Sequence, residues 1–330
     1  MAIKPIGTSL TSVEIQTEFG GVVPISLSEY YGLASGIPTT GQPINMSAFY
    51  GKTFVVFEKI TTSRVWTPKL NLSRFIHLYV IGAGGSGGHA WPASNVGTYG
   101  NTDGVAGAGG GGAGGMSYSI ITGTTSGSAN ILIGTGGTGV SVGGEQSAIN
   151  GNPGTSSSFV GLGLNMTAAG GTGGNASQAT SGGGDSTSGT GGAGGSASGG
   201  NNLNLIGGSG GGYSISGDSV RTTAAGGGAP RFLTAHNGTA TNSVTDNITN
   251  GAKVSLYNNY PSILTSYISG RSQLPFLGTS ITDFDGSDGN RSSSGTSAPL
   301  YGAGSGGSAV QNSSPTGRGG AGLVMIIYEI

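Results

Sequence analysis

Acidic side chains gather in one short stretch of this chain, DFDGSDGN at 283–290. Asp283, Asp285 and Asp288 lie near one another in sequence around two glycines, and carboxylate oxygens at such spacing are the ligands that calcium-binding loops use. A loop of the EF-hand type places a bidentate glutamate at its twelfth position, where this chain has Ser294. The stretch therefore predicts a candidate calcium site, with a solvated acidic turn as the simpler interpretation. No other cofactor is expected.

Two glycine-containing motifs match enzyme signatures. Residues 82–87 spell G-x-G-x-x-G after an apolar run, as in dinucleotide-binding folds, but a helix should follow, and residues 89–101 contain Pro92 and further glycines. The nucleophile motif G-x-S-x-G occurs around Ser86 and Ser209, and only three histidines could serve as a base. In a chain with 72 glycines both patterns are expected by chance, so we expect no enzyme activity.

Aromatic side chains beside amide and carboxylate groups offer a third candidate chemistry. Aromatic rings pack against the C–H faces of sugars, while amides and carboxylates hydrogen-bond to sugar hydroxyls. Two loops carry such groups, and the second lies at 230–301, where glycine thins and aromatics increase. A packing role within each loop is the alternative, favoured for the second loop because its aromatics have helical spacing. The candidates are Trp91, Asn95, Tyr99 and Asp103 in the first loop and Tyr257, Tyr260 and Tyr267 in the second.

Glycine dominates the elements that must position these residues. Of the 330 residues, 72 are glycine, against a usual share of about 7%. A flexible low-complexity chain is the first interpretation of this composition. Against it, apolar strand-like segments at 75–81, 131–133 and 323–328 flank the glycine runs, and charges are almost absent between 104 and 184, unlike in typical disordered chains.

An ordered alternative for the glycine runs is the polyproline-II conformation, with three residues per turn and a rise of about 3.1 Å per residue. Helices without side chains can pack backbone against backbone and exchange N–H···O=C bonds, with Ala and Ser facing outward. Ordering glycine in regular structure costs roughly 0.5–1 kcal/mol more than ordering alanine, so nearly every backbone group must be satisfied. The sequence leaves open whether the runs form packed helices or turns. The predicted fold is mainly β: an antiparallel, sandwich-like glycine-rich domain in which packed polyglycine-II helices are a candidate element.

Alternation of apolar and polar residues predicts strands at 54–60 and 75–81. Residues 116–121 and 129–133 are expected to pair as a hairpin, because a short polar turn sequence separates them. The final apolar stretch at 323–328 is expected to form a last strand.

The N-terminal segment differs from the rest of the chain. Residues 13–19 alternate weakly between apolar and polar, and residues 45–53 predict a brief turn of helix. The segment is too small to bury a core alone, so we expect it to dock onto another protein or onto its own copies. The predicted domains are an attachment segment at 1–58 and a glycine-rich domain at 59–330, with a surface insertion at 230–301.

Charge and composition exclude several classes of partner. The formal net charge is −1, and no basic patch emerges, so nucleic acid is not an expected partner. The chain has no cysteine, hence no disulfide or thiolate metal site. No run approaches 18 apolar residues, and the first residues lack an apolar core, so neither membrane insertion nor a signal peptide is expected. We expect the protein to be made in a cytoplasm.

Residues 14–53 and the glycine-rich stretches at 75–88 and 317–330 together resemble virion proteins of tailed bacteriophages, above all tail-fibre and related tail proteins. Near the C-terminus, GRGGAGLVMIIYEI (317–330) is similar to the last strand of their glycine-rich β domain, and FIHLYVIGAGGSGG (75–88) to an earlier part of it. The domain is also similar to the glycine-helix adhesins at the fibre tips of T-even-type phages, whose N-terminus differs from this one. The N-terminal stretches that carry the resemblance are EIQTEFGG (14–21), PISLSEYYG (24–32) and IPTTGQPINMSAFYGKT (37–53).

The resemblance implies a protein of the virion tail that is made in the host cytoplasm. Its N-terminal segment would join other tail or baseplate proteins, and its glycine-rich domain would act as an adhesin for a bacterial surface glycan or an outer-membrane protein. Most fibres are trimers and the adhesins are single caps, so a homo-oligomer, most simply a trimer, or a fibre cap is expected. The residues that would make the virion attachment are Glu18, Phe19, Tyr30, Tyr31, Phe49 and Tyr50.

Two other functions compete with receptor binding. The first is a purely structural virion component, such as a collar, baseplate or fibre-joint protein. The second is an ice-binding or cell-wall glycine-rich protein, which would need a flat, regular face of Thr or Ser and has no reason to carry the motif at 1–53.

Overall fold

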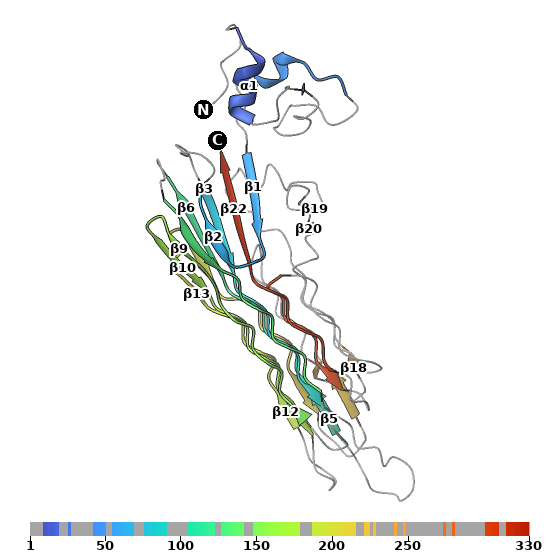
Figure 1. Ribbon diagram of the computed structural model, residues 1–330. Helices are drawn as coiled ribbons and strands as arrows, with labels where there is room; N and C mark the ends of the chain where they lie inside the picture. Colours follow the sequence, from blue (N-terminus) through green and yellow to red (C-terminus); the bar gives the residue numbers. More distant parts are fainter. Residues whose placement is uncertain are drawn as a thin grey trace, which may run out of the picture.

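The two largest sheets lie at one end of an elongated molecule, and their strands continue into glycine segments that run to the other end (Figure 1). The protein is mainly β, with several antiparallel sheets, as the sequence predicts. This computed structural model describes residues 9–19, 26–27, 42–50, 55–68, 76–90, 105–122, 127–141, 148–178, 187–215, 221–224, 227–228, 241–242, 247–248, 273–274, 279–280, 301–309 and 315–329.

The N-terminal segment forms a short helix rather than a strand. Helix α1 spans Ser12–Phe19, and the weak alternation at 13–19 is therefore not the mark of a strand. A capping box explains its start: the Glu14 N–H donates to Thr11 Oγ1 at 3.3 Å, and the Thr11 N–H donates to Glu14 Oε2 at 2.9 Å. The 3₁₀ helix η2 (Met46–Phe49) confirms the turn predicted at 45–53. Both lie beyond the end of the sheets in Figure 1.

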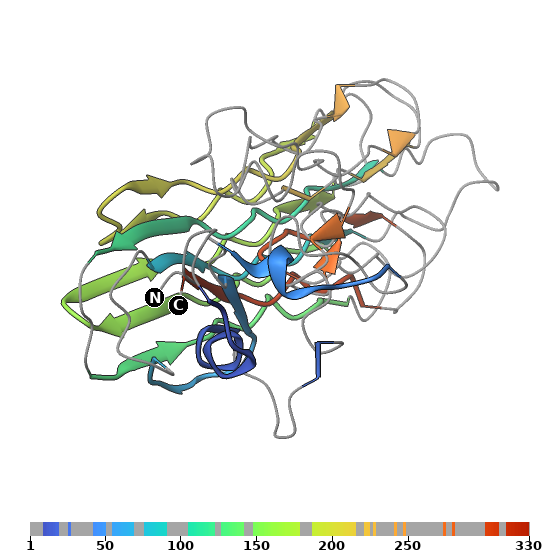
Figure 2. The same ribbon diagram turned by 90° about the horizontal axis from the view of Figure 1, so that it is seen from above.

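Two five-stranded antiparallel sheets face one another. Figure 2, which views the molecule from above, shows their strands in two layers. The first sheet has the order β1 (Val55–Ile60), β22 (Leu323–Glu329), β3 (Ile76–Ile81), β6 (Met116–Ile121) and β14 (Leu203–Leu205). The second has the order β13 (Ala197–Ser198), β10 (Leu164–Ala168), β9 (Ser157–Gly161), β7 (Ala129–Leu132) and β2 (Arg64–Trp66).

Apolar side chains from both sheets form one core between the layers. Leu78 and Ile326 of the first sheet meet Phe159 and Met166 of the second, and all four are fully buried. The ring of Trp66 lies against that of Phe159, with centroids 6.1 Å apart. Because inward-facing residues of two sheets pack into a single core, this part of the fold is a β-sandwich.

The expected hairpin of β6 and β7 is wrong, because the two strands belong to opposite sheets. Strand β6 pairs along its length with β3, and β7 pairs with β9. Alternation reveals a strand but not its partner, and each strand here finds a longer ladder with a more distant segment. The next pair, β9 and β10, is a true hairpin: Leu162 (φ 53°) and Gly163 (φ 78°) both have positive φ, as a two-residue type I′ turn requires.

Glycine segments extend the strands of the sandwich. Strand β3 runs into 82–88 and β10 into 169–175, while 315–322 leads into β22. In Figure 1 they descend side by side towards the far end of the molecule, where β5 (Val105–Ala108), β12 (Thr187–Gly189) and β18 (Asn247–Ile248) lie. The described glycine segments are 82–88, 109–115, 134–140, 150–156, 169–175, 190–196, 206–212, 302–307 and 315–322.

Hydrogen bonding shows that these segments are packed threefold helices. Successive N–H groups of 109–115 point to different neighbours and return to the same neighbour at every third residue, with N···O distances of 2.7–3.1 Å. This is the geometry of a polyproline-II helix with three residues per turn. The same segment accepts bonds from 82–88, 190–196 and 227–228. Its donors are Gly109, Gly112 and Gly115 to 169–175, Gly110 and Ala113 to 206–212, and Gly111 and Gly114 to 302–307.

Glycine is required at the contacts between helices. A Cβ atom on Gly111 would lie 2.2 Å from the carbonyl oxygen of Gly85, and one on Gly114 would lie 2.0 Å from that of Gly82. Both distances are far inside van der Waals contact, and the obstacle is backbone that is itself hydrogen-bonded. The candidate polyglycine-II element is therefore present as a bundle whose interior is backbone.

Short strands close the far end of the glycine segments around Tyr213. A Cβ on Gly107 would lie 2.3 Å from the Tyr213 ring and one on Gly189 2.5 Å from it, so the ring fills the space that these glycines leave. The Tyr213 hydroxyl donates to Ser177 Oγ at 2.5 Å, and burial raises the pKa of Tyr213 against the opposing effect of this bond.

The remaining strands are β4 (His89–Ala90), β5 (Val105–Ala108), β8 (Ala148–Ile149), β11 (Ala176–Gln178), β12 (Thr187–Gly189), β15 (Tyr213–Ile215), β16 (Arg221–Ala224), β17 (Thr241–Asn242), β18 (Asn247–Ile248), β19 (Gln273–Leu274), β20 (Thr279–Ser280) and β21 (Ser308–Ala309). Within the described ranges, no helix is long and apolar enough to cross a membrane.

Candidate functional site

Threonine, asparagine and serine side chains form rows on the outside of the glycine bundle. In 169–175 the exposed residues are Thr172 and Asn175, and in 190–196 they include Thr190 and Ser196. The helix has three residues per turn and a rise of about 3.1 Å per residue, so side chains three residues apart point the same way and repeat about every 9 Å. Each row is therefore a line of small, mostly polar side chains with a fixed spacing.

Neighbouring rows are joined by hydrogen bonds in which their side chains take part. The Asn175 amide donates to Thr190 Oγ1 at 2.9 Å, and the Ala193 N–H donates to Thr172 Oγ1 at 2.7 Å. Segments 134–140 and 150–156 continue the pattern, since the Asn152 amide donates to the oxygens of Thr138 at 3.0 Å. These bonds fix the side chains in place, so the rows present an ordered array. We call the array of Thr135, Thr138, Asn152, Thr155, Thr172, Asn175, Thr190, Ala193 and Ser196 the outer face.

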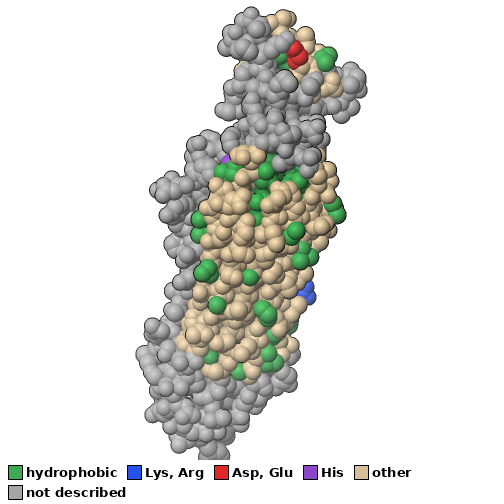
Figure 3. All heavy atoms as spheres, turned by 90° about the vertical axis from the view of Figure 1, so that its left-hand side faces the viewer, with side chains coloured by type: hydrophobic (Ala, Val, Ile, Leu, Met, Phe, Trp, Pro, Cys, Tyr) green, Lys and Arg blue, Asp and Glu red, His purple; other side chains and the backbone are tan. Residues whose placement is uncertain are grey.

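Charge is nearly absent from this side of the molecule. Figure 3 shows the side that carries β9, β10 and β13, where the described surface is mostly uncharged polar groups and backbone with apolar side chains among them, and charged side chains appear only at its edge and its upper end. Such a surface can bind through hydroxyl and amide hydrogen bonds and small apolar contacts, as neutral polar ligands and ordered polar surfaces require.

Most of the residues predicted for binding lie outside the described part of the chain, so their roles stay predictions. The ends of the first aromatic loop are described: β4 ends at Ala90 and β5 begins at Val105, and these strands contact each other at the far end of the glycine segments. The residues outside the described ranges are Trp91, Asn95, Tyr99 and Asp103, Tyr257, Tyr260 and Tyr267, and the acidic residues Asp283, Asp285 and Asp288.

The predicted attachment residues are placed in part. Phe49 is fully buried in η2, and Tyr50 beside it is half-buried, so Phe49 stabilises this segment from inside. Glu18 and Phe19 end helix α1, while Tyr30 and Tyr31 lie outside the described residues.

The enzyme-like motifs occupy structural positions. Segment 82–87 is a glycine helix that leads into strand β4, not into the helix that a dinucleotide site requires. Ser86 is fully buried, and its Oγ accepts a bond from the Asn152 N–H at 2.7 Å, which ties two glycine segments together. His77 packs inside β3 with its Nδ1 2.7 Å from the Tyr118 hydroxyl. No cluster of metal-binding side chains occurs among the residues with described positions.

Sequence reasoning missed the outer face, although a signal for it exists. The runs AGGTGGN (169–175) and TGGAGGS (190–196) repeat x-G-G without interruption. In a threefold helix this repeat puts every x on one side. The repeat is only two turns long, and the many glycines around it hide the phase.

The fold is a β-sandwich whose strands continue into a bundle of glycine helices, and the bundle carries the outer face. The chain belongs to the glycine-rich domain family, which it matches over residues 60–329. No curated protein matches this sequence.

Proposed function

We propose that this chain is a tail-fibre or tail-tip protein of a bacteriophage virion that acts as an adhesin for a receptor on the host surface. One structural observation carries the proposal: the glycine bundle is stiff without a side-chain core, because its backbone amides bond one another in three directions. A rigid body of this kind with little charge suits a particle that must hold a contact surface outside cells. The virion location is proposed from the resemblance of residues 1–53 to phage tail proteins.

Attachment and recognition would lie at opposite ends. Helix α1 and η2 lie beyond the sandwich, whereas the ends of the first aromatic loop, Ala90 and Val105, lie at the far end of the glycine segments (Figure 1). The N-terminal segment would then join tail or baseplate proteins while the far end meets a glycan or an outer-membrane protein. Several copies on one particle would add weak contacts into firm adhesion.

Binding of the purified full-length chain to host bacteria tests the adhesin proposal. We expect labelled protein to bind cells saturably and to slow adsorption of the phage that carries it. Antibody labelling of particles in electron micrographs should place the chain on the tail.

Absence of cell binding, together with labelling of the tail, would replace the adhesin with the purely structural alternative. Hydrogen bonds within the outer face favour that alternative, because the side-chain amides of Asn152 and Asn175 already donate to neighbouring threonines and so are less available to a receptor. Labelling absent from the particle would remove the virion proposal altogether.

A second candidate function, ice binding, is favoured by one observation. The outer face supplies the regular Thr and Ser rows that such a protein needs, with Thr172 and Thr190 on adjacent segments. A measured gap between the melting and freezing temperatures of ice, lost when Thr172 is replaced by lysine, would support it. The motif at 1–53 has no part in this function, and an unaltered freezing point would eliminate it.

A further inference from the structure

A groove of about 680 Å³ opens beside the outer face. Three segments far apart in sequence form it: the turn at 61–63 between β1 and β2, residues 133–138, and residues 318–321. Its volume falls within the range of about 300–1,000 Å³ that small-ligand sites occupy. It shares Thr135 and Thr138 with the outer face, and its other lining residues belong to neither the outer face nor the enzyme-like sequence motifs.

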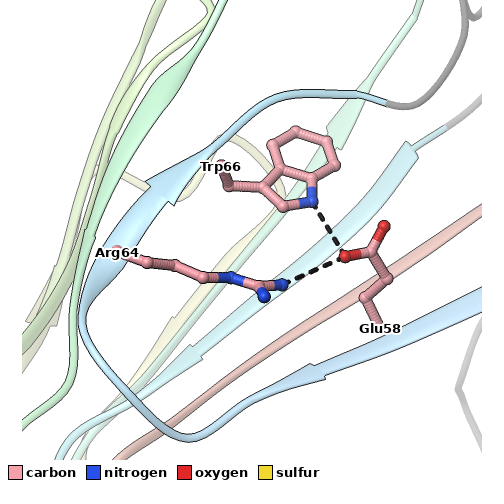
Figure 4. Close-up of polar contacts among 3 residues, drawn as sticks. All are labelled: Glu58, Arg64 and Trp66. Carbon is pink, nitrogen blue, oxygen red and sulfur yellow. Dashed lines mark hydrogen bonds and ion pairs between the residues drawn. The ribbon is translucent and has the colours of Figure 1, made fainter.

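The first wall of the groove is held by an ion pair and two hydrogen bonds. Glu58 of β1 accepts from Arg64 at 3.2 Å and from the Trp66 indole N–H at 3.1 Å (Figure 4). Ser63 Oγ accepts from the Ile133 N–H at 2.9 Å, which fastens the turn to the groove floor. The turn therefore presents Thr61 and Thr62 from a fixed position.

The floor and second wall are two glycine segments that bond directly to each other. The Gly319 N–H donates to the Gly137 carbonyl at 2.9 Å, and the Gly322 N–H donates to that of Gly134 at 2.9 Å. A Cβ on Gly136 would lie 1.9 Å from the Gly319 carbonyl oxygen, so the two backbones are in close contact. A groove with such walls is preformed, and a ligand would not have to order it.

The groove combines an apolar lining with hydroxyl groups and one positive charge. Hydroxyl side chains line it from both sides, including Thr61, Thr62 and Thr138. Within the described part of the chain, no hydrogen bond engages the hydroxyls of Thr61 and Thr62. Arg318 is exposed and is the one charged side chain among the described lining residues.

We propose that this groove binds an anionic saccharide unit, that is, a sugar that bears a carboxylate or a phosphate. The Arg318 guanidinium would pair with the anionic group, for which its fork of donors is suited. Thr61, Thr62 and Thr138 would hydrogen-bond sugar hydroxyls, and Ile133 would contact a C–H face. The assignment rests on the proposed receptor binding for its biological role, and it adds a saccharide site beside the sandwich to the contacts proposed at the far end.

Calorimetric titration of the full-length chain tests the groove without cells. The probes are hexagalacturonate for the carboxylate, mannose 6-phosphate for the phosphate, and maltohexaose as a neutral sugar. We expect an anionic probe to bind in a salt-sensitive manner and maltohexaose to bind about tenfold more weakly or not at all. Binding of only one anionic probe identifies the anionic group and supports the proposal.

Two substitutions of exposed residues test whether the sugars bind in the groove, and a third substitution is the control. Arg318→Gln should weaken anionic-sugar binding by about tenfold or more, because it removes a charge-assisted bond. Thr62→Trp should block the groove by filling it. Lys59→Gln removes a positive charge outside the lining and should leave binding unchanged. Thermal unfolding of each variant checks that the fold is intact.

The two proposals fail separately. If neither anionic probe binds, or if Arg318→Gln binds like the parent protein, the groove assignment is overturned, whatever the chain does on cells. If the sugars bind as expected but the parent protein does not bind host cells, the groove assignment is supported and the adhesin proposal is overturned.

Discussion

The sandwich and the glycine bundle share the same chain segments but are stabilised in opposite ways. In the sandwich, side chains such as Phe159 and Met166 fill the space between two sheets. In the bundle, the interior of 109–115 is backbone, and hydrogen bonds to neighbours on all sides replace side-chain packing. The comparison teaches that a buried interior needs satisfied polar groups and close contact, and that apolar volume is only one route to them.

The two regions should therefore respond to opposite changes. Removing atoms should damage the sandwich, because it leaves a cavity. Adding atoms should damage the bundle, because neighbouring backbones already touch.

The largest effect is expected from adding one methyl group at the centre of the bundle. Gly111→Ala would bring a Cβ to 2.2 Å from the Gly85 carbonyl oxygen, and backbone on all sides prevents relaxation. We expect a loss of more than about 5 kcal/mol in the free energy of unfolding, beyond the usual range for single substitutions. Denaturant unfolding measures it.

Ala193→Ser is the matched control, since it adds an atom to an exposed position of a similar glycine segment. It should change the free energy of unfolding by less than about 0.5 kcal/mol. Equal effects for the two variants would show that the bundle is looser than its hydrogen bonds indicate.

A smaller effect is expected from removing atoms in the sandwich. Phe159 is fully buried between the sheets and contacts Trp66. Phe159→Ala should lower the free energy of unfolding by about 3–5 kcal/mol. Hydrogen exchange should show that amides of β9 and β10 lose protection first, whereas equal loss throughout the glycine segments would mean that both regions unfold as one unit.

A single hydrogen bond of the outer face is worth less. Thr172→Val keeps the shape of the side chain but removes the oxygen that accepts from the Ala193 N–H at 2.7 Å. Because the position is exposed and water can replace the bond, we expect a loss of about 1 kcal/mol. Faster exchange of the Ala193 amide, with β9 unaffected, would confirm that the effect is local.

The smallest effect is a dependence on alkaline pH. Burial raises the pKa of Tyr118 in the sandwich and of Tyr213 at the far end of the bundle, against opposing hydrogen bonds from Tyr79 and Ser177. Above the unfolded pKa of about 10, the unfolded chain loses these protons before the folded chain does, so stability is complete below about pH 10 and falls above it.

Replacing each tyrosine by phenylalanine should remove part of this alkaline loss. Tyr118→Phe and Tyr213→Phe can be compared with the parent protein in unfolding titrations at about pH 9 and about pH 11. A fall in stability that neither substitution reduces would assign the alkaline sensitivity to other groups.

The sequence predicts the strands well and their partners poorly. Apolar runs mark β3 and β22 because buried strands need such residues, and the two strands form as expected. The partner of β6 was misjudged because alternation within a segment carries no information about distant segments. The sequence could not decide whether the glycine runs form packed helices or turns, because the bonds that define the packing join distant segments. The Gly114 N–H, for example, donates to the carbonyl of Gly302.

The candidate site was less predictable than the fold. The x-G-G repeat at 169–175 could have located the outer face, because a threefold helix turns that spacing into a row. The groove could not have been found, because it combines a turn at 61–63 with segments at 133–138 and 318–321. The predicted binding aromatics and the acidic loop remain predictions.

Continuity between strands and glycine segments has a consequence for how this chain can change its length. Losing one residue from 109–115 would turn every later donor in that helix by about a third of a turn, away from its established neighbour. Losing three would restore the direction and shorten the rod by about 9 Å. Insertions and deletions in these segments should therefore be tolerated as triplets, and in several adjacent segments at once.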